Sequence, residues 1–349
     1  MSSSPRDRVI AQISHRETDH IPYTLGWEGD VAERLDAHYG SHAWRALVDN
    51  DLRHIPVPNL VWEETGEPRY TDYYGTTWRL DRRPAHLEKP ALQSPSLAGY
   101  TFPDLDALYT PEWKAQALRA CAELHDHFTL AGFGFGLFER SWALRGFADV
   151  LMDAAGDPDF YDELIERIAE HQLSIVERLV QLPVDGIMFS DDWGYQQGVL
   201  LGPERWRRFL KPRLARLYTC AHQAGKYALS HCCGSVADII PDLIEIGLDV
   251  LESVQPEAMN PYELKCRYGD RITFWGGLGS QSTIPFGTPQ AISDEVARLC
   301  REMGRGGGYI LAPAKALQPE TPTENAAALL EAFLGQAGVR VLAEGECAL

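Results

Sequence analysis

The chain has 349 residues, of which 45% are hydrophobic and 23% are charged, as is usual for a globular protein. Its formal net charge of −18 argues against nucleic acid and anionic membrane surfaces as main partners, because an acidic surface repels both. A chain of this length fits two domains or one large α/β barrel, and we expect a single barrel domain over residues 1–349.

The first 22 residues, MSSSPRDRVIAQISHRETDHIP, contain no apolar run of signal-peptide length, and no later run reaches membrane-spanning length. We therefore expect a cytoplasmic protein. The seven cysteines are scattered and odd in number, which does not match a disulfide framework. Only the adjacent pair Cys232 and Cys233 lies where we expect chemistry.

Short apolar runs alternate with longer amphipathic stretches, which is typical of βα units. The expected strands are residues 21–27, 56–62, 128–138, 184–190, 226–232, 248–254, 272–278 and 308–314. Among the stretches between them, residues 157–182, 235–247 and 288–304 have helical spacing and polar first residues. Eight strands close a (β/α)8 barrel, so we predict an α/β fold, a TIM barrel with an N-terminal extension.

The gap between the second and third expected strands, residues 63–127, is too long for one crossover helix. It contains YTDYYGTTWRL, which predicts a β-hairpin, and a proline-rich stretch that reaches Pro103. We interpret this segment as an insertion that caps the barrel mouth.

Active sites of such barrels lie at the carboxyl ends of the strands. The candidate substrate-binding residues at these ends are Trp27, Glu28, Trp62, Glu139, Arg140, Trp193, Gln196, Gln255 and Gln281. Glu139 and Arg140 are expected to form an ion pair that orders the rim. The tryptophans fit core packing, but several of them at strand ends also suggest a flat or bulky substrate.

The clearest motif is in ALSHCCGSVADII, residues 228–240. Residues two apart on an extended chain point to the same side, so His231 and Cys233 can both face the mouth. Imidazole and thiolate are zinc ligands, and a catalytic zinc site needs a third protein ligand and an open position. The neighbouring strand ends offer three carboxylates for that role: Asp191, Asp192 and Glu252. The alternative to a metal site is that His231 is an ordinary hydrogen-bonded histidine and Cys233 an inert buried thiol.

Asp191, Asp192 and Lys315 are the candidate catalytic residues. Two adjacent carboxylates in a dry pocket do not both ionise readily, so one can act as an acid or base. Alternatively, one caps the next helix and the other faces water. Lys315 follows the eighth strand, a place that favours anion binding, although general-base and purely solvated roles also fit a lysine.

Several segments together resemble the uroporphyrinogen decarboxylase superfamily. They are RDRVIAQISHRETDHIPY, DDWGYQQG, HCCGSVADIIPDLIEIGLDVLESVQP, ITFWGGLGSQ and LAPAKALQPETPTEN, in the family's order across nearly the whole chain. The resemblance implies a (β/α)8 barrel. True uroporphyrinogen decarboxylases act on a tetrapyrrole without metal and carry an arginine-rich stretch near the N-terminus. Here that stretch reads LGWEGDVAERL, and Lys315 stands where those enzymes have a histidine.

The second branch of the superfamily contains zinc-dependent methyltransferases of corrinoid systems, whose ligands are His-x-Cys and a distant cysteine. His231 and Cys233 match the first two, whereas Lys315 occupies the position of the third. The resemblance thus implies a metal-assisted methyltransferase or demethylase. It would move a methyl group between a small substrate or thiol and cobalamin on a partner protein, with zinc as its metal.

Two alternatives remain open. One is a metal-free decarboxylase of a small carboxylate or tetrapyrrole, and the other is a non-catalytic barrel that binds a small molecule. The assembly is open as well, with a homodimer as one form to consider.

Overall fold

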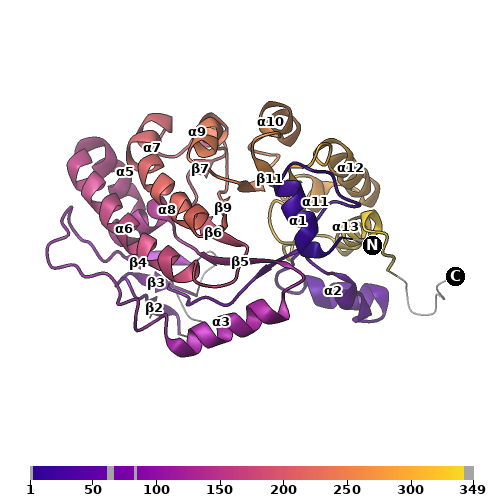
Figure 1. The fold of residues 1–349 in the computed structure, drawn as a ribbon, viewed down its shortest axis with the longest axis horizontal. Helices are drawn as coiled ribbons and strands as arrows, with labels where there is room; N and C mark the ends of the chain where they lie inside the picture. The colour runs from indigo at the N-terminus through magenta and orange to yellow at the C-terminus, as the bar shows by residue number, and fades with distance from the viewer. Residues whose placement is uncertain (1–2, 61–66, 82–84, 342–349) are drawn as a thin grey trace.

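The computed structural model describes residues 3–60, 67–81 and 85–341. Within these residues, a parallel sheet of seven strands forms the centre of the molecule (Figure 1). In order of pairing, the strands are β1 (Leu52–His54), β5 (Phe128–Phe133), β6 (Gly186–Ser190), β9 (Tyr227–His231), β10 (Val250–Val254), β11 (Thr273–Leu278) and β12 (Tyr309–Pro313). Because all neighbours are parallel, their carboxyl ends lie at one end of the sheet.

Residues 21–27 take the eighth place, between β12 and β1. Tyr23 forms a parallel bridge with Leu311, and the N–H of Thr24 donates to the Leu311 carbonyl at 3.0 Å. On the other side, the N–H of Asp51 donates to the Tyr23 carbonyl at 3.0 Å. The curled sheet with its alternating helices is therefore the expected (β/α)8 TIM barrel.

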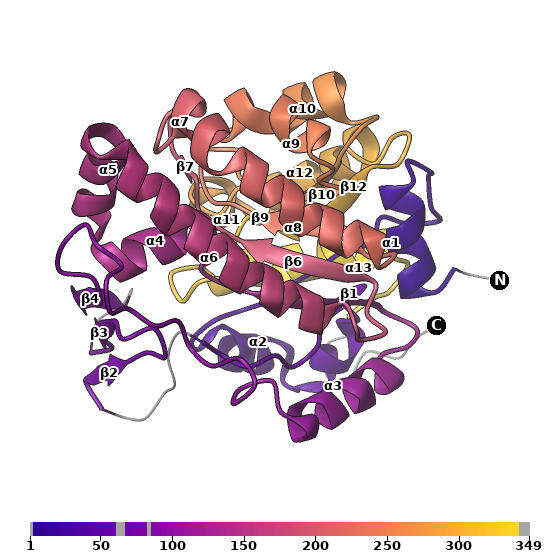
Figure 2. The ribbon, with the colours of Figure 1, turned by 60° about the vertical axis from the view of Figure 1, so that its left-hand side comes forward.

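The helices lie around the sheet, as the turned view in Figure 2 shows. They are α1 (Pro5–Ile13), α2 (Val31–Tyr39), α3 (Pro111–Glu123), α4 (Leu137–Arg145), α5 (Phe147–Gly156), α6 (Pro158–Leu179), α7 (Pro203–Phe209), α8 (Lys211–Gln223), α9 (Ile240–Glu245), α10 (Pro261–Tyr268), α11 (Thr283–Phe286), α12 (Pro289–Glu302) and α13 (Thr323–Gln336). Two 3-10 helices accompany them, η1 (Ala43–Leu47) and η2 (Ala237–Ile239). None of the described helices combines the length and the apolar character needed to cross a membrane.

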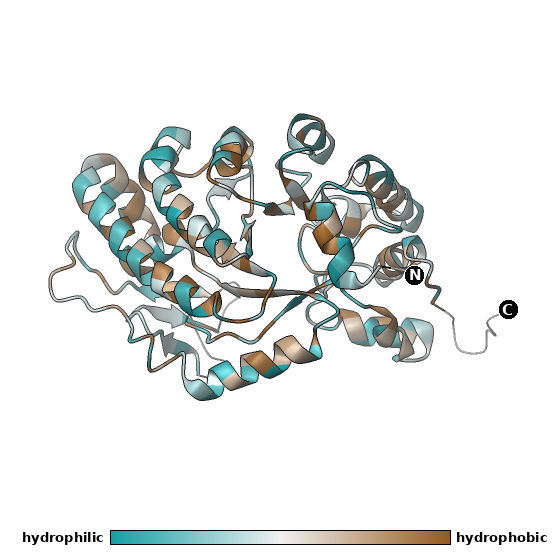
Figure 3. Cartoon of the chain, in the orientation of Figure 1, coloured by the Kyte–Doolittle hydropathy of each residue, from teal (hydrophilic) through white to brown (hydrophobic). Residues whose placement is uncertain are grey.

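Helix α6 shows how these elements follow from the sequence. The Asp157 side chain accepts the N–H of Phe160 at 3.3 Å, and Pro158 begins the helix, where a missing N–H costs nothing. Leu164 and Ile168 lie four residues apart on the buried face, whereas the outward face of α6 is largely hydrophilic (Figure 3). The helix therefore buries one stripe and packs against α8.

The N-terminal extension is α1, which closes the bottom of the barrel. Val9 and Ile13 pack among the side chains that fill the barrel interior, including Leu130. The carbonyl of Gln12 accepts the N–H of Gly308 at 2.9 Å, just before β12 begins. The amino ends of the strands are thus covered by apolar contacts.

The expected strand at 56–62 is wrong over its described part, residues 56–60, because the second strand of the barrel is β1, Leu52–His54. Pro56 and Pro58 have no N–H to donate to a neighbouring strand, and the chain leaves the sheet before them. The third strand also ends sooner than expected, at Phe133, and α4 begins at Leu137.

Two of the expected helices are confirmed, because α6 covers 158–179 and α12 covers 289–302. The stretch 235–247 is instead divided between η2 and α9.

The expected hairpin at 70–80 is confirmed within a small antiparallel sheet of β2 (Arg69–Thr71), β3 (Thr77–Arg79) and β4 (His86–Lys89). This sheet packs against α4, because the Thr76 hydroxyl donates to the Ala143 carbonyl at 2.9 Å and Trp78 contacts Trp142. The boundaries of the insertion and its role as a cap stay predictions.

Candidate active site

Inward-pointing side chains form an apolar floor with polar groups above it. The floor contains Leu52, Leu130, Met188, Leu229, Val250, Trp275 and Ile310. Because side chains alternate along a strand, the residue two positions later on three of these strands also points inward. These residues are His54 on β1, His231 on β9 and Glu252 on β10.

Asp192, His231 and Cys233 form the cluster at the mouth that is suited to a metal ion. One ligand atom from each lies within 4.8 Å of the other two. Nε2 of His231 is 3.4 Å from Sγ of Cys233 and 3.5 Å from Oδ1 of Asp192. Catalytic zinc sites have three protein ligands and one open position, and carboxylate, imidazole and thiolate are all groups that bind zinc. These three residues therefore fit a zinc ion.

Glu252 contacts the other nitrogen of the same ring. Its carboxylate hydrogen-bonds to Nδ1 of His231, which leaves Nε2 to face Asp192 and Cys233. Burial by itself lowers the pKa of His231, but Glu252 and Cys233 outweigh it and hold that pKa well above its usual value. This geometry favours Asp192 as the third ligand and Glu252 as the group that orients the imidazole.

Asp191 is a helix cap. It is 2% exposed and accepts the N–H groups of Phe138 at 2.9 Å and Glu139 at 2.8 Å, both in the first turn of α4. Trp193 adds a third hydrogen bond, from its indole Nε1 at 2.6 Å. Burial raises the pKa of Asp191 to about 7 in spite of these bonds. Asp191 therefore caps a helix, but that helix is α4, which precedes it in the chain, and not the next helix as expected.

Glu139 lies beside the cluster, in the first turn of α4, where the charges of Asp191 and Asp192 act on it. Desolvation, followed by the charges of Asp191 and Asp192, raises the pKa of Glu139 to about 8. At neutral pH this carboxyl therefore retains its proton.

The expected Glu139–Arg140 ion pair is wrong. Arg140 is 1% exposed, and its guanidinium carbon lies 3.6 Å from the centre of the Tyr74 ring. Its Nη1 is 3.6 Å from the Asp72 carboxylate, next to the small sheet. Neighbouring residues on a helix point about 100° apart, so the first turn of α4 sends the two side chains to different surroundings.

The tryptophans are mostly packed. Trp193 is buried against Trp206 at a ring distance of 5.7 Å, and Trp27 is partly buried with its ring 5.0 Å from that of Trp44. Trp62 lies outside the described residues.

Two other predicted site residues lie outside the cluster of Asp192, His231 and Cys233. Glu28 donates its backbone N–H to the Leu317 carbonyl at 2.8 Å, and Lys315 is exposed in the loop after β12.

The three predicted glutamines are brought together. Nε2 of Gln255 donates to Oε1 of Gln196 at 3.4 Å, and Nε2 of Gln196 donates to Oε1 of Gln281 at 3.1 Å. They come from the loops after β10, β6 and β11, so the amides link three loops at the rim.

Sequence reasoning missed His54, because it placed the second strand four residues too late. His54 is open to solvent on one side, while the barrel wall surrounds the rest of its ring. The partial loss of hydration lowers the pKa of His54, and the charge of Glu252 opposes this effect. The alternation of Leu52 and His54 ahead of Pro56 was the signal for an inward-facing histidine.

The family model for uroporphyrinogen decarboxylase (URO-D) matches residues 81–334, most of the barrel. The chain belongs to the uroporphyrinogen decarboxylase family. Members of this family among the curated relatives carry two activities in their names. A methylcobamide:CoM methyltransferase MtaA from Methanosarcina barkeri is 29% identical over 174 residues, which is 50% of this chain and 48% of the relative. The chain thus spans about half the length of that relative.

A uroporphyrinogen decarboxylase from Pseudomonas fluorescens is 22% identical over 303 residues, 82% of this chain and 77% of the relative. Among solved structures, a methyltransferase from Methanosarcina mazei superposes with a TM-score of 0.71 at 21% identity, covering 95% of this chain and 98% of that one. The structural likeness shows that the two chains share the barrel fold.

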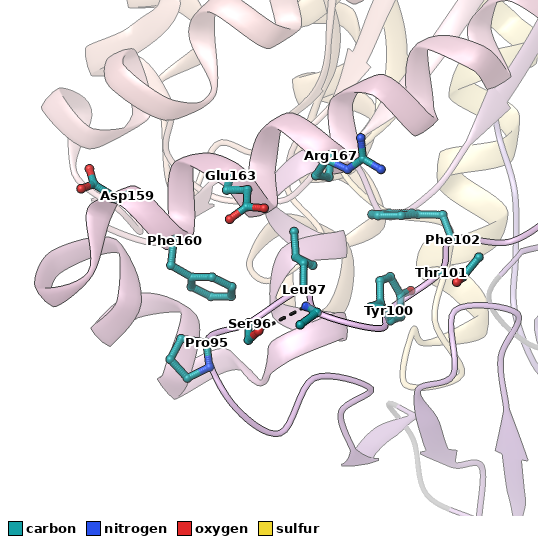
Figure 4. A pocket seen from close by; sticks show the side chains of 11 residues that line it. Pro95, Ser96, Leu97, Tyr100, Thr101, Phe102, Asp159, Phe160, Glu163 and Arg167 are labelled. Carbon is teal, nitrogen blue, oxygen red and sulfur yellow. Dashed lines mark hydrogen bonds between the residues drawn. The ribbon is translucent and has the colours of Figure 1, made fainter.

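This uroporphyrinogen decarboxylase family member also has a surface cavity of about 1080 Å³ between α6 and residues 95–102 (Figure 4). Phe160 and Phe102 point into it, and Asp159, Glu163 and Arg167 lie along its α6 side. None of its lining residues belongs to the polar cluster at the mouth.

Proposed function

We propose that this family member is a metal-assisted methyltransferase or demethylase. It moves a methyl group between a small substrate or thiol and a corrinoid on a partner protein. The observation that carries the proposal is the cluster of Asp192, His231 and Cys233, with one ligand atom from each within 4.8 Å of the others. The name of the Methanosarcina barkeri relative supports the same class of reaction.

His231 through Nε2, Cys233 through Sγ and Asp192 through its carboxylate would hold zinc. When bound, zinc supplies Lewis acidity, which lowers the pKa of a thiol or polarises the heteroatom that carries a methyl group. Asp192 replaces the distant cysteine that the family resemblance implies, since Lys315 occupies that cysteine's place.

The surrounding residues prepare the site for this chemistry. Glu252 holds the His231 ring in one orientation through Nδ1. In the metal-free chain, burial and the neighbouring carboxylates raise the pKa of Glu139 to about 8, which makes this carboxyl the candidate to give a proton to a heteroatom that loses a methyl group. The apolar floor beneath excludes water from below.

The corrinoid partner would dock at the open end of the barrel. The net charge of −18 favours a carrier with a neutral or basic docking patch. Because salt screens such charges, the carrier is expected to associate with this protein more slowly at high salt.

Metal content tests the proposal. Protein purified without an affinity tag is measured by plasma mass spectrometry, next to Cys233→Ser, Asp192→Asn and the control Cys266→Ser. Cys266 is exposed on α10, outside the cluster. We expect about one zinc per chain in the wild type and the control, and little or none in Cys233→Ser. A chain that takes up no zinc even when zinc is supplied contradicts the proposal.

A metal-free decarboxylase is the second candidate. The protonated Glu139 favours it, because such a carboxyl can return a proton to carbon after CO₂ leaves. Protein stripped of metal with a chelator is tested for release of CO₂ from a small carboxylate. Activity in this protein that is lost in Glu139→Gln would support this candidate over the first.

A further inference from the structure

The turn that carries Cys233 has a partner for each of five consecutive backbone N–H groups. Cys232 donates to the Glu252 carbonyl (2.5 Å), Cys233 to Oδ1 of Asp192 (2.8 Å), Gly234 to Oε1 of Gln255 (3.2 Å), Ser235 to the Tyr195 carbonyl (2.8 Å) and Val236 to Sδ of Met259 (3.2 Å). A buried N–H without a partner costs free energy, so the loops around this turn hold it in one conformation.

The turn also touches a neighbouring hairpin, backbone to backbone. The hairpin consists of β7 (Gly194–Tyr195) and β8 (Gly198–Val199). A Cβ on Gly234, whose φ is +76°, would lie 2.6 Å from the carbonyl carbon of Gly194. A Cβ on Gly194 would lie 2.6 Å from the Cys233 carbonyl oxygen. Such an approach requires glycine on both sides and leaves the turn little room to shift.

Gln255 is the side chain that ties this turn to the rim. It is 7% exposed, and its amide has one defined orientation, because the Gly234 N–H can only donate and so must face Oε1. Nε2 then donates to Gln196, whose own Nε2 donates to Gln281. The three amides form a directional chain that starts at the residue after Cys233.

We infer that Gln255 is a positioning residue for Cys233. It acts through the Gly234 amide, and Gln196 and Gln281 keep its side chain in the required orientation. The inference rests on the proposed function only in making Cys233 a metal ligand. The placement of the turn is a property of the metal-free chain. The loops after β6, β10 and β11 therefore set the direction of the Cys233 thiol together.

Hydrogen exchange of the metal-free protein, measured by mass spectrometry on peptides that cover residues 232–236, tests the placement. In Gln255→Leu we expect exchange there to be about tenfold faster, since the Gly234 N–H loses its acceptor. Gln255→Glu keeps an acceptor but loses the donor to Gln196, so a smaller rise is expected. The matched control is Gln172→Leu on α6, a glutamine that is also buried and that donates to the Phe135 carbonyl.

Cobalt(II) binding gives a second readout that a general loss of stability would not produce. The thiolate-to-cobalt absorption band reports on the Cys233 ligand, and we expect about 10- to 100-fold weaker binding with an altered band in Gln255→Leu. Gln255→Glu should restore most of the affinity. Gln172→Leu should bind cobalt like the wild type.

Unchanged exchange in folded Gln255→Leu would overturn the inference, as would an equal rise at this turn in Gln172→Leu. If Gln255→Leu does not fold, Gln196→Ala takes its place, because Gln196 is exposed and its substitution is less disruptive. Hydrogen exchange at the wild-type rate in Gln196→Ala would also overturn the inference. A wild-type chain that binds no cobalt refutes the proposed function, whereas the exchange measurement still decides the role of Gln255.

Discussion

Glu252 and His231 are register partners on adjacent strands, and they share a hydrogen bond through Nδ1 of the imidazole. Both residues lie two positions past an apolar floor residue, Val250 and Leu229. The bond aims the remaining nitrogen at Asp192, so one carboxylate sets the direction in which the ring can bind a ligand.

Glu252→Gln is expected to weaken zinc binding about tenfold, because the amide keeps an acceptor for Nδ1 but removes the charge that makes the ring more basic. In the metal-free variant the pKa of His231 should fall, since Glu252 is the main group that raises it. Competition with a chelating dye measures the first effect, and NMR titration of the histidine measures the second.

The control is Glu257→Gln, a glutamate that accepts the Gln281 N–H at 2.9 Å on the rim. Equal zinc affinities in Glu252→Gln and Glu257→Gln would show that the imidazole needs no carboxylate partner.

Stability should depend on the ionisation of Glu139. Its pKa is about 8 in the folded chain and 4.5 ordinarily, so the folded state retains a proton that the unfolded state releases. The free energy of unfolding therefore falls as pH rises through this window, by on the order of 2 kcal/mol between pH 6 and pH 8. Glu139→Gln cannot ionise and should show a flatter profile in urea unfolding at pH 6, 7 and 8. Parallel profiles for the two proteins would contradict the shifted pKa.

Gly136 leaves room for the Asp191 cap. A Cβ at this position would lie 2.4 Å from Cβ of Asp191 and 2.9 Å from its Oδ2. Gly136→Ala should therefore cost about 1–3 kcal/mol of stability, because the cap and the first turn of α4 have to move apart. Gly134→Ala, in the same loop with nothing within 4 Å, is the control. Thermal unfolding compares the two variants, and similar losses would mean that the cap tolerates the extra carbon.

The buried pair Arg8–Asp51 joins α1 to the start of β1 at 2.8 Å. Arg8→Met leaves the Asp51 carboxylate buried, with the Tyr23 N–H as its remaining hydrogen-bond donor among the described residues, and we expect a loss of about 3–5 kcal/mol. Arg6→Met, on the same helix, breaks a more exposed pair with Asp185 and should cost less than about 1 kcal/mol. Urea unfolding measures both, and equal losses would place the ion pair of Arg8 among ordinary surface pairs.

Much of the fold could be predicted because most barrel strands are short apolar runs with turn residues beside them. Residues 184–190 and 272–278 have this character, and β6 and β11 lie within them. β1 was harder to predict because it has three residues, one of them a buried leucine and the others Arg53 and His54. Such a strand is stabilised by its neighbours in the sheet rather than by its own composition.

The site was predictable where its geometry is local. His231 ends β9 and Cys233 follows two residues later, so the two are close along the chain, and Asp192 follows the adjacent strand. The role of Asp191 depends on the N–H groups of a helix more than fifty residues earlier in the chain, a contact that no local pattern contains. The divergence of Glu139 and Arg140 likewise depends on where α4 begins.

Val9 and Ile13 of α1 pack into the amino end of the barrel interior, so the polar cluster faces the opposite, carboxyl end. Under the proposed function, the small reactant and the carrier protein would both approach the cluster from that end. The small molecule would then have to bind before the carrier covers the end, and an excess of carrier is expected to slow turnover.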